Sequence, residues 1–127
     1  MLPEILRQEV NALQAEGYAV ELIEAEGFAN ILLHKYPLPN SYNRSITELL
    51  LRFPMSYPNG KPDMFWTDED LLLLNGQIPN RADQIECYLG QRWRRFSWHA
   101  TAWNPGTDNL RMYLEFINTG LLKATKL

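Results

Sequence analysis

The chain contains little cysteine and little histidine, and its glycines stand singly. Its 127 residues include one cysteine, Cys87, and two histidines, His34 and His99. A single cysteine excludes an internal disulfide, and these three residues do not follow a recognised metal-binding spacing, so we expect no metal site. Isolated glycines exclude a glycine-rich phosphate loop, and we expect no bound cofactor.

Long hydrophobic runs are also missing, although 46% of the residues are hydrophobic. The longest apolar stretches, such as Leu71 to Leu74, fall far short of the roughly 20 residues that a transmembrane helix needs. No positively charged segment followed by an apolar one begins the sequence. We therefore expect a cytoplasmic protein that does not bind a membrane.

Neither sign of charge dominates, since 12 basic and 15 acidic residues give a net charge of -3. Such a chain lacks the broad positive field that attracts a phosphate backbone, so we expect no nucleic-acid partner. The local exception is the segment 92–98, where arginines alternate with aromatic residues that could hold single-stranded nucleic acid. The same pattern also suits a strand with one face in the core and one in water.

The length and the 12% of aromatic residues fit one domain over residues 1–127 with a single core. Residues 3–16 are predicted to form an amphipathic helix, because Leu6, Val10 and Leu13 recur with the helical period and Gly17 follows. A second helix is expected after Thr107 or Asp108, either of which can cap it, with apolar residues at helical spacing as far as Leu121. Gly120 falls near its expected end.

The segments between the helices show the period of β-strands. Residues 18–24 alternate, and the runs 28–34 and 46–53 are rich in β-forming residues, so an antiparallel meander is predicted. Prolines then force an extended path before a short fourth strand at 64–66. Residues 67–92 give no clear pattern, and 93–99 could add a final strand. The pattern indicates a two-layer α+β fold.

Two proline-containing motifs carry a resemblance to a known family. The first is the stretch 49–66, LLLRFPMSYPNGKPDMFW, with Phe-Pro at 53–54, Tyr-Pro at 57–58 and a further proline at Pro62. The second is Trp-Asn-Pro at 103–105, which leads into the late helix. These motifs resemble the ubiquitin-conjugating enzyme (UBC) superfamily over nearly the whole chain. The stretches WRRFSWH and WNPGTDNL are similar to a prokaryotic, bacterial branch of that superfamily.

The resemblance implies a UBC-like fold with an N-terminal helix, a four-stranded antiparallel meander sheet, an irregular active-site segment and a C-terminal helix. It also implies partners, which are a ubiquitin-like protein, its activating enzyme and a deubiquitinase-like protease. Because a family likeness does not fix an activity, the chemistry has to be argued from individual residues.

Cys87 is the candidate nucleophile. A UBC enzyme needs a thiolate that accepts the activated carboxyl terminus of a ubiquitin-like protein as a thioester. The tripeptide Ile78-Pro79-Asn80 stands seven residues before Cys87, where the family has His-Pro-Asn. Ile78 replaces the family's histidine, and the sixteen residues from Cys87 to Trp103 form a longer gap than the family's. The alternative is that Cys87 is a small packed hydrophobe in the core.

Asn80 and His99 are the candidate assisting residues. By the resemblance, Asn80 would donate a hydrogen bond to the oxyanion formed when an amine attacks the thioester, and the alternative is a turn residue. His99 precedes the turn where the family's active-site groove lies, so its neutral imidazole could accept a proton from the amine or orient Cys87. The alternative is a hydrogen-bonded structural histidine.

Two functions follow from these residues. In the first, the chain is a transferase-type conjugating enzyme of a bacterial modification system, which accepts a ubiquitin-like protein as a thioester on Cys87 and passes it to an amine. In the second, it is a non-catalytic UBC-fold module that binds a ubiquitin-like protein or its activating enzyme. Formation of a thiol-sensitive adduct distinguishes them.

Overall fold

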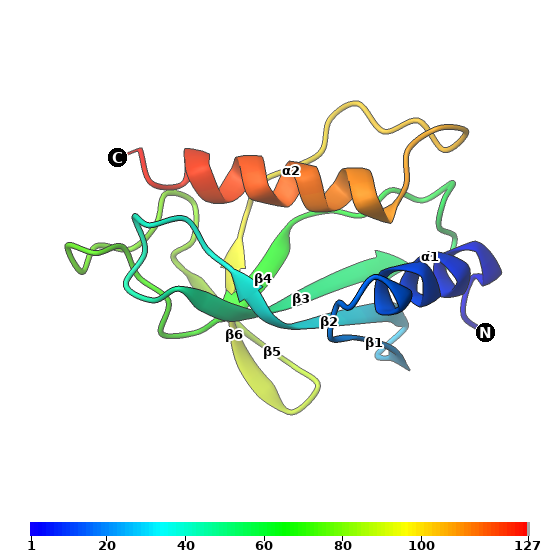
Figure 1. Cartoon of the computed structure of the whole chain (residues 1–127), viewed down its shortest axis with the longest axis horizontal. Coiled ribbons are helices and arrows are strands. Elements are labelled where there is room, and N and C mark those ends of the chain that lie inside the picture. The colour runs from blue at the N-terminus through cyan, green and yellow to red at the C-terminus, as the bar shows by residue number, and fades with distance from the viewer. Residues whose placement is uncertain (127) are drawn as a thin grey trace.

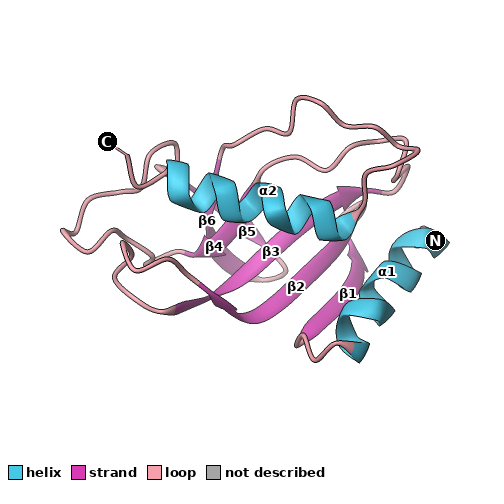
Figure 2. Cartoon of the chain, turned by 45° about the horizontal axis from the view of Figure 1, so that its top comes forward, coloured by secondary structure: helices cyan, strands magenta, loops and turns pink. Residues whose placement is uncertain are grey.

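Two helices lie on one face of a six-stranded antiparallel sheet (Figures 1 and 2) in the computed structural model, which describes residues 1–126. The strand order across the sheet is β1-β2-β3-β4-β6-β5. The elements in chain order are α1 (Glu4–Ala15), β1 (Val20–Ala25), β2 (Phe28–Pro37), β3 (Ile46–Pro54), β4 (Phe65–Asp68), β5 (Gln84–Tyr88), β6 (Gln91–Phe96) and α2 (Leu110–Lys123).

The predicted meander is confirmed, because β1 to β4 are neighbours in the order in which they occur in the chain. Alternate residues of β2 and β3 face the helices, and Ile31 lies opposite Leu51 while Ala29 lies opposite Phe53. All four side chains are fully buried. This alternation is the one that a sheet with one face against helices requires.

Both predicted helices are confirmed, with one correction at the start of α2. The capping residue is Asn109, whose side chain accepts a hydrogen bond from the amide of Met112 at 3.0 Å, rather than Thr107 or Asp108. Gly120 lies inside α2 and does not end it. A Cβ atom there would lie 3.1 Å from the Phe65 ring, so the glycine allows the helix to approach β4 closely.

The expectation of four strands is wrong, because β5 and β6 form a hairpin that extends the sheet beyond β4. Leu89 and Gly90 connect the two strands, with φ values of 53° and 73°. Two residues at positive φ are typical of the tight turn that joins twisted antiparallel strands. The segment 67–92 therefore holds a regular strand where an irregular stretch was expected.

The hairpin covers part of the sheet face that the helices leave open (Figure 1). Leu50, Trp66 and Trp93 are buried there, and the hairpin residues Tyr88 and Leu89 pack against them. The guanidinium of Arg52 lies 3.6 Å from the centre of the Tyr88 ring, which adds a cation-π contact. The sheet thus has a helix-covered face and a face partly covered by its own hairpin.

Neither helix within residues 1–126 is long and apolar enough to cross a membrane.

Candidate functional site

His99 lies in the loop between β6 and α2, where Asp63 holds it from the loop between β3 and β4. Its Nδ1 lies 2.7 Å from Oδ1 of Asp63. Both side chains are partly exposed, at 49% and 40%. A carboxylate on Nδ1 fixes the orientation of an imidazole and leaves Nε2 as the nitrogen that can meet another group.

Two hydrogen bonds near the Asp63–His99 pair connect the two loops. The ammonium of Lys61 donates to the carbonyl of Ala100 at 2.9 Å, and the indole of Trp103 donates to the carbonyl of Pro58 at 2.8 Å. These are bonds from side chain to backbone between segments about 40 residues apart in sequence. They hold His99 in a braced irregular region rather than in a regular strand.

A pocket of about 360 Å³ lies between the loop that carries His99 and the outer side of α2. The Tyr113 phenol lines it and donates to the carbonyl of Met64 at 2.5 Å. Burial raises the pKa of the Tyr113 phenol, so the phenol stays neutral and serves as a donor. Further lining residues include Trp103, Met112, Phe116 and Lys123. The pocket has an apolar wall, with an imidazole and an ammonium among its lining groups.

Asn80 lies in a turn beside the C-terminal end of α2. Its backbone amide donates to the carbonyl of Ala124 at 2.8 Å, and its backbone carbonyl lies 3.3 Å from the indole nitrogen of Trp98. The side chain itself is exposed. Asn80 therefore lies close to Trp98, the residue before His99, and its backbone links the turn to α2.

Cys87 is exposed and lies on β5, one of the two edge strands of the sheet. It pairs directly with Arg92 of β6, whose guanidinium is bound to Glu69 at 2.8 Å. The neighbouring Glu86 points to the opposite face. There its carboxylate accepts hydrogen bonds from Trp66 at 2.9 Å and from Arg95 at 2.7 Å.

The fold does not bring Cys87 together with His99. Cys87 is level with Arg92 near the closed end of the hairpin, whereas His99 follows the opposite end of β6. At about 3.3 Å per residue, the strand from Arg92 to Phe96 alone covers about 13 Å. Beyond Phe96 the chain continues in the same direction, because Phe96 pairs with Phe65 and His99 then reaches Asp63.

The basic and aromatic segment 92–98 is used largely inside the protein. Trp93 and Phe96 are buried, so their ring faces cannot stack on bases. Arg94 is also buried and donates to the carbonyls of Glu69 and Ala82 at 3.1 and 2.6 Å. The alternation in this segment therefore reflects a strand with two covered faces.

Two clusters in which a histidine contacts carboxylate side chains were not indicated by the sequence. One is the pair of Asp63 and His99, whose members belong to irregular loops and show no common spacing. The other places His34 between Glu21 and Glu48 of the flanking strands. Strand register is the signal that could have revealed the second cluster. Over residues 1–126 the structure contains no group of three or more His, Cys, Asp or Glu side chains able to hold a metal ion.

The N-terminal helix, the antiparallel meander, the proline-containing loop between β3 and β4 and the C-terminal helix make an α+β fold that is consistent with the UBC-like class, although the sheet has six strands. The chain belongs to a family in this class, because residues 5–124 match the model described as Prokaryotic E2 family E. The resemblance stated from the sequence is thereby confirmed. No curated protein and no solved structure matches the chain.

Proposed function

We propose that this E2-like protein is a binding module for a ubiquitin-like protein or its activating enzyme, and that it does not carry the ubiquitin-like protein as a thioester on Cys87. The observation that supports this proposal is the separation of Cys87 from both candidate assisting residues. Cys87 lies near the closed end of the hairpin, while Asn80 and His99 lie toward α2.

Thioester transfer needs several groups around one reacting carbon. A base has to lie within hydrogen-bond reach of the attacking amine, directly or through one water, and the oxyanion needs a donor at similar range. The strand from Arg92 to Phe96 alone exceeds that reach by several fold, at about 13 Å. This separation supports the inference that His99 and Asn80 do not assist a reaction at the sulfur of Cys87.

The charged side chains next to Cys87 are bound to residues other than Cys87. The Arg92 guanidinium, which could stabilise a thiolate, is bound to Glu69. Glu86 accepts hydrogen bonds from Trp66, Tyr88 and Arg95 on the other face of the hairpin. The surroundings of Cys87 therefore resemble a structural edge strand more than a reaction centre.

The conjugating enzyme is the second candidate, and the exposure of Cys87 favours it. An accessible sulfur opposite an arginine could accept an activated carboxyl terminus. Transfer from it would then depend on groups supplied by the partner or the acceptor. In this candidate His99 and Asn80 have no part in the chemistry at Cys87.

The test incubates the full chain with its cognate ubiquitin-like protein and activating enzyme, together with ATP. Binding is measured by calorimetry, and covalent capture by electrophoresis with and without thiol. We expect binding that is equal in wild type and Cys87→Ala, with no thiol-sensitive adduct. Gln84→Ala, an exposed change on the same strand, controls for disturbance of the hairpin. A thiol-sensitive adduct that forms in wild type and Gln84→Ala but not in Cys87→Ala would establish the enzyme instead.

A further inference from the structure

His34 lies between two carboxylates that come from different strands. Its Nδ1 is 2.5 Å from Oε1 of Glu48 on β3, and its Nε2 is 2.5 Å from Oε2 of Glu21 on β1. A neutral imidazole has only one N–H group, so it can donate to one carboxylate at a time. The arrangement with both contacts made therefore requires the doubly protonated imidazolium.

At the same place the pairing of β2 with β3 is interrupted. The register between β2 and β3 shifts between Leu33 and Tyr36, and Lys35 has a φ of 54°. The amide of Lys35 donates to the other oxygen of Glu48, at 3.1 Å, instead of to a strand. Glu48 thus replaces backbone pairing where the bulge removes it, and the imidazolium connects Glu48 to β1.

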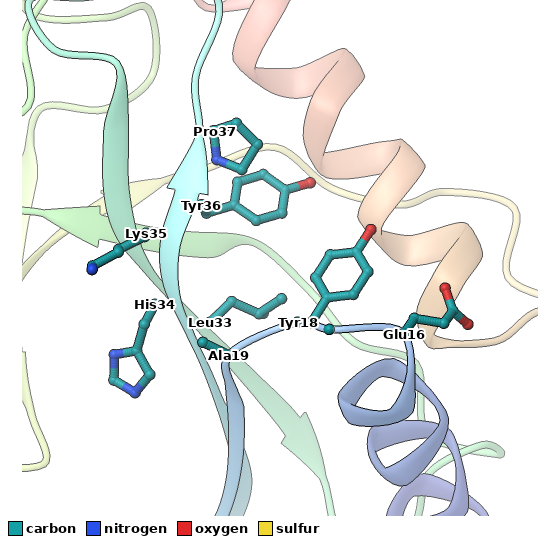
Figure 3. Close-up of a pocket in the computed structure, with 9 residues that line it drawn as sticks. Glu16, Tyr18, Ala19, Leu33, His34, Lys35, Tyr36 and Pro37 are labelled. Atoms are coloured by element: carbon teal, nitrogen blue, oxygen red, sulfur yellow. The ribbon is translucent and has the colours of Figure 1, made fainter.

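A pocket of about 400 Å³ adjoins this bulge (Figure 3). In Figure 3, His34 points to one side of β2, while Tyr18 and Tyr36 lie on the other side with the end of α1. The amide of His34 donates to the carbonyl of Ala19 at 2.9 Å, just before β1 begins. The position of β1 and the wall of this pocket therefore depend on the contacts of His34.

We propose that Glu21, His34 and Glu48 form a proton-dependent staple that holds β1 to β2 and β3 and fixes the wall of this pocket. Loss of the imidazolium proton leaves one carboxylate without a donor. The end of β1 that carries Glu21 then separates more often from the bulge in β2. This device is independent of the binding function proposed above.

The electrostatic surroundings give the pH range of the staple. Hydrogen bonds that His34 donates first to Glu21 and then to Glu48 raise the pKa of His34 above its ordinary value of 6.5, against a smaller opposing effect of burial. Burial raises the pKa of Glu48, but hydrogen bonds from His34 and the Lys35 amide outweigh it and leave that pKa lowered. Both contacts of His34 are therefore made at pH values between the ordinary pKa of a glutamate and that of a histidine.

The sign of the effect follows from these directions. Because the folded-state pKa of His34 is raised, its contribution to stability is present below 6.5 and is lost as the pH rises through the raised value. The other charged groups near it are Lys35, the next residue of β2, and Asp68. Asp68 accepts a hydrogen bond from the Glu48 amide and is bound to Arg44.

His99 offers an internal control, because it is the other histidine of the chain and contacts a single carboxylate. One N–H group satisfies that contact, so a neutral His99 keeps it. The single contact of His99 therefore does not need a doubly protonated ring, whereas the two contacts of His34 do.

The test follows the ring ¹⁵N shifts of His34 from pH 6 to 9, assigned with His34→Gln and His99→Gln. It also follows amide exchange of β1 over the same range, corrected for intrinsic rates. We expect His34 to lose its second ring proton with a midpoint above the ordinary value of 6.5, and β1 protection to fall by about two- to five-fold as this proton leaves, the size typical of exposed ion pairs. The double variant Glu21→Gln with Glu48→Gln should remove the pH dependence, and His99→Gln should keep it.

Two results would overturn the proposal. One is a His34 ring in the wild type that loses its second proton with a midpoint at or below the ordinary value of 6.5. The other is β1 protection whose pH dependence is the same in wild type and in the Glu21→Gln, Glu48→Gln double variant. The side chains concerned are 36% to 57% exposed, so these variants are expected to fold.

Discussion

The hairpin that carries Cys87 and the two loops that carry Asp63 and His99 are held in place in different ways. The hairpin is regular, and buried aromatic residues fix its inner face on the sheet. The loops are irregular, and individual bonds such as those of Lys61 and Trp103 tie them together. A pocket adjoins the loop that carries His99, whereas Cys87 lies on the edge strand β5.

This difference shows that order along the chain is a poor guide to grouping in space. Cys87 precedes His99 by only twelve residues. The turn at Leu89-Gly90 reverses the chain, so β6 then carries it away from the cysteine. The hairpin thus separates in space two residues that are close in sequence.

The largest expected effect comes from removing the anchor of the hairpin. Trp93 is buried beside Leu50 and Trp66, so Trp93→Ala should lower the free energy of unfolding by about 3–5 kcal/mol through the lost contacts and the cavity. Urea unfolding followed by circular dichroism measures it. A loss below about 1 kcal/mol would mean that the hairpin is not held by this cluster.

A smaller loss is expected when the hairpin's polar connection is removed. Glu86→Ala leaves the donors of Trp66 and Arg95 without their acceptor, which should cost about 1.5–3 kcal/mol. Burial raises the pKa of Glu86, but hydrogen bonds from Trp66 and Tyr88 and the charge of Arg95 outweigh it and lower that pKa. The difference in free energy of unfolding between wild type and Glu86→Ala should therefore be largest above the ordinary glutamate pKa. It should shrink as the pH falls through the lowered value. A difference that stays constant in acid would contradict this account.

On the loop side, a single bond can be removed while the ring is kept. Trp103→Phe retains an aromatic group next to Tyr57 but loses the bond to the Pro58 carbonyl, so the expected cost is about 0.5–1.5 kcal/mol. The chemical shift of His99 should move as the loops loosen, while hairpin amides stay in place. Shifts confined to the hairpin would contradict the division into two regions.

The smallest effect is expected at Cys87 itself. The side chain is exposed, so Cys87→Ala should change the free energy of unfolding by less than about 0.5 kcal/mol. In the native wild type, a thiol reagent should label Cys87 without prior unfolding. Slow labelling that tracks global unfolding would show that the sulfur is buried.

Periodic segments could be predicted from the sequence, and aperiodic ones could not. Leu6, Val10 and Leu13 mark α1 because a helix repeats its apolar face, and β2 and β3 alternate for the equivalent reason. The hairpin was missed because Leu89 is a rare residue at positive φ and gives no turn signal. Both sides of β5 are also only partly buried, which weakens its alternation.

The candidate site was harder to predict than the fold. His99 was identified by residue type, but its partner Asp63 lies 36 residues away in an irregular loop, and no spacing rule connects the two. The relation of Cys87 to Asn80 and His99 depends on how the chain turns between them. That geometry is set by one two-residue turn, so the sequence pattern alone could not give it.

A paramagnetic label attached to the sole cysteine gives the most direct check of the spatial layout. Relaxation of backbone amides and of the His99 ring then reports how far each lies from the sulfur of Cys87. The account predicts strong signal loss at Tyr88 and Gln91, with the His99 ring and the Asn80 amide keeping most of their intensity. Equal broadening of His99 and Gln91 would place the imidazole beside the thiol and contradict the proposed separation.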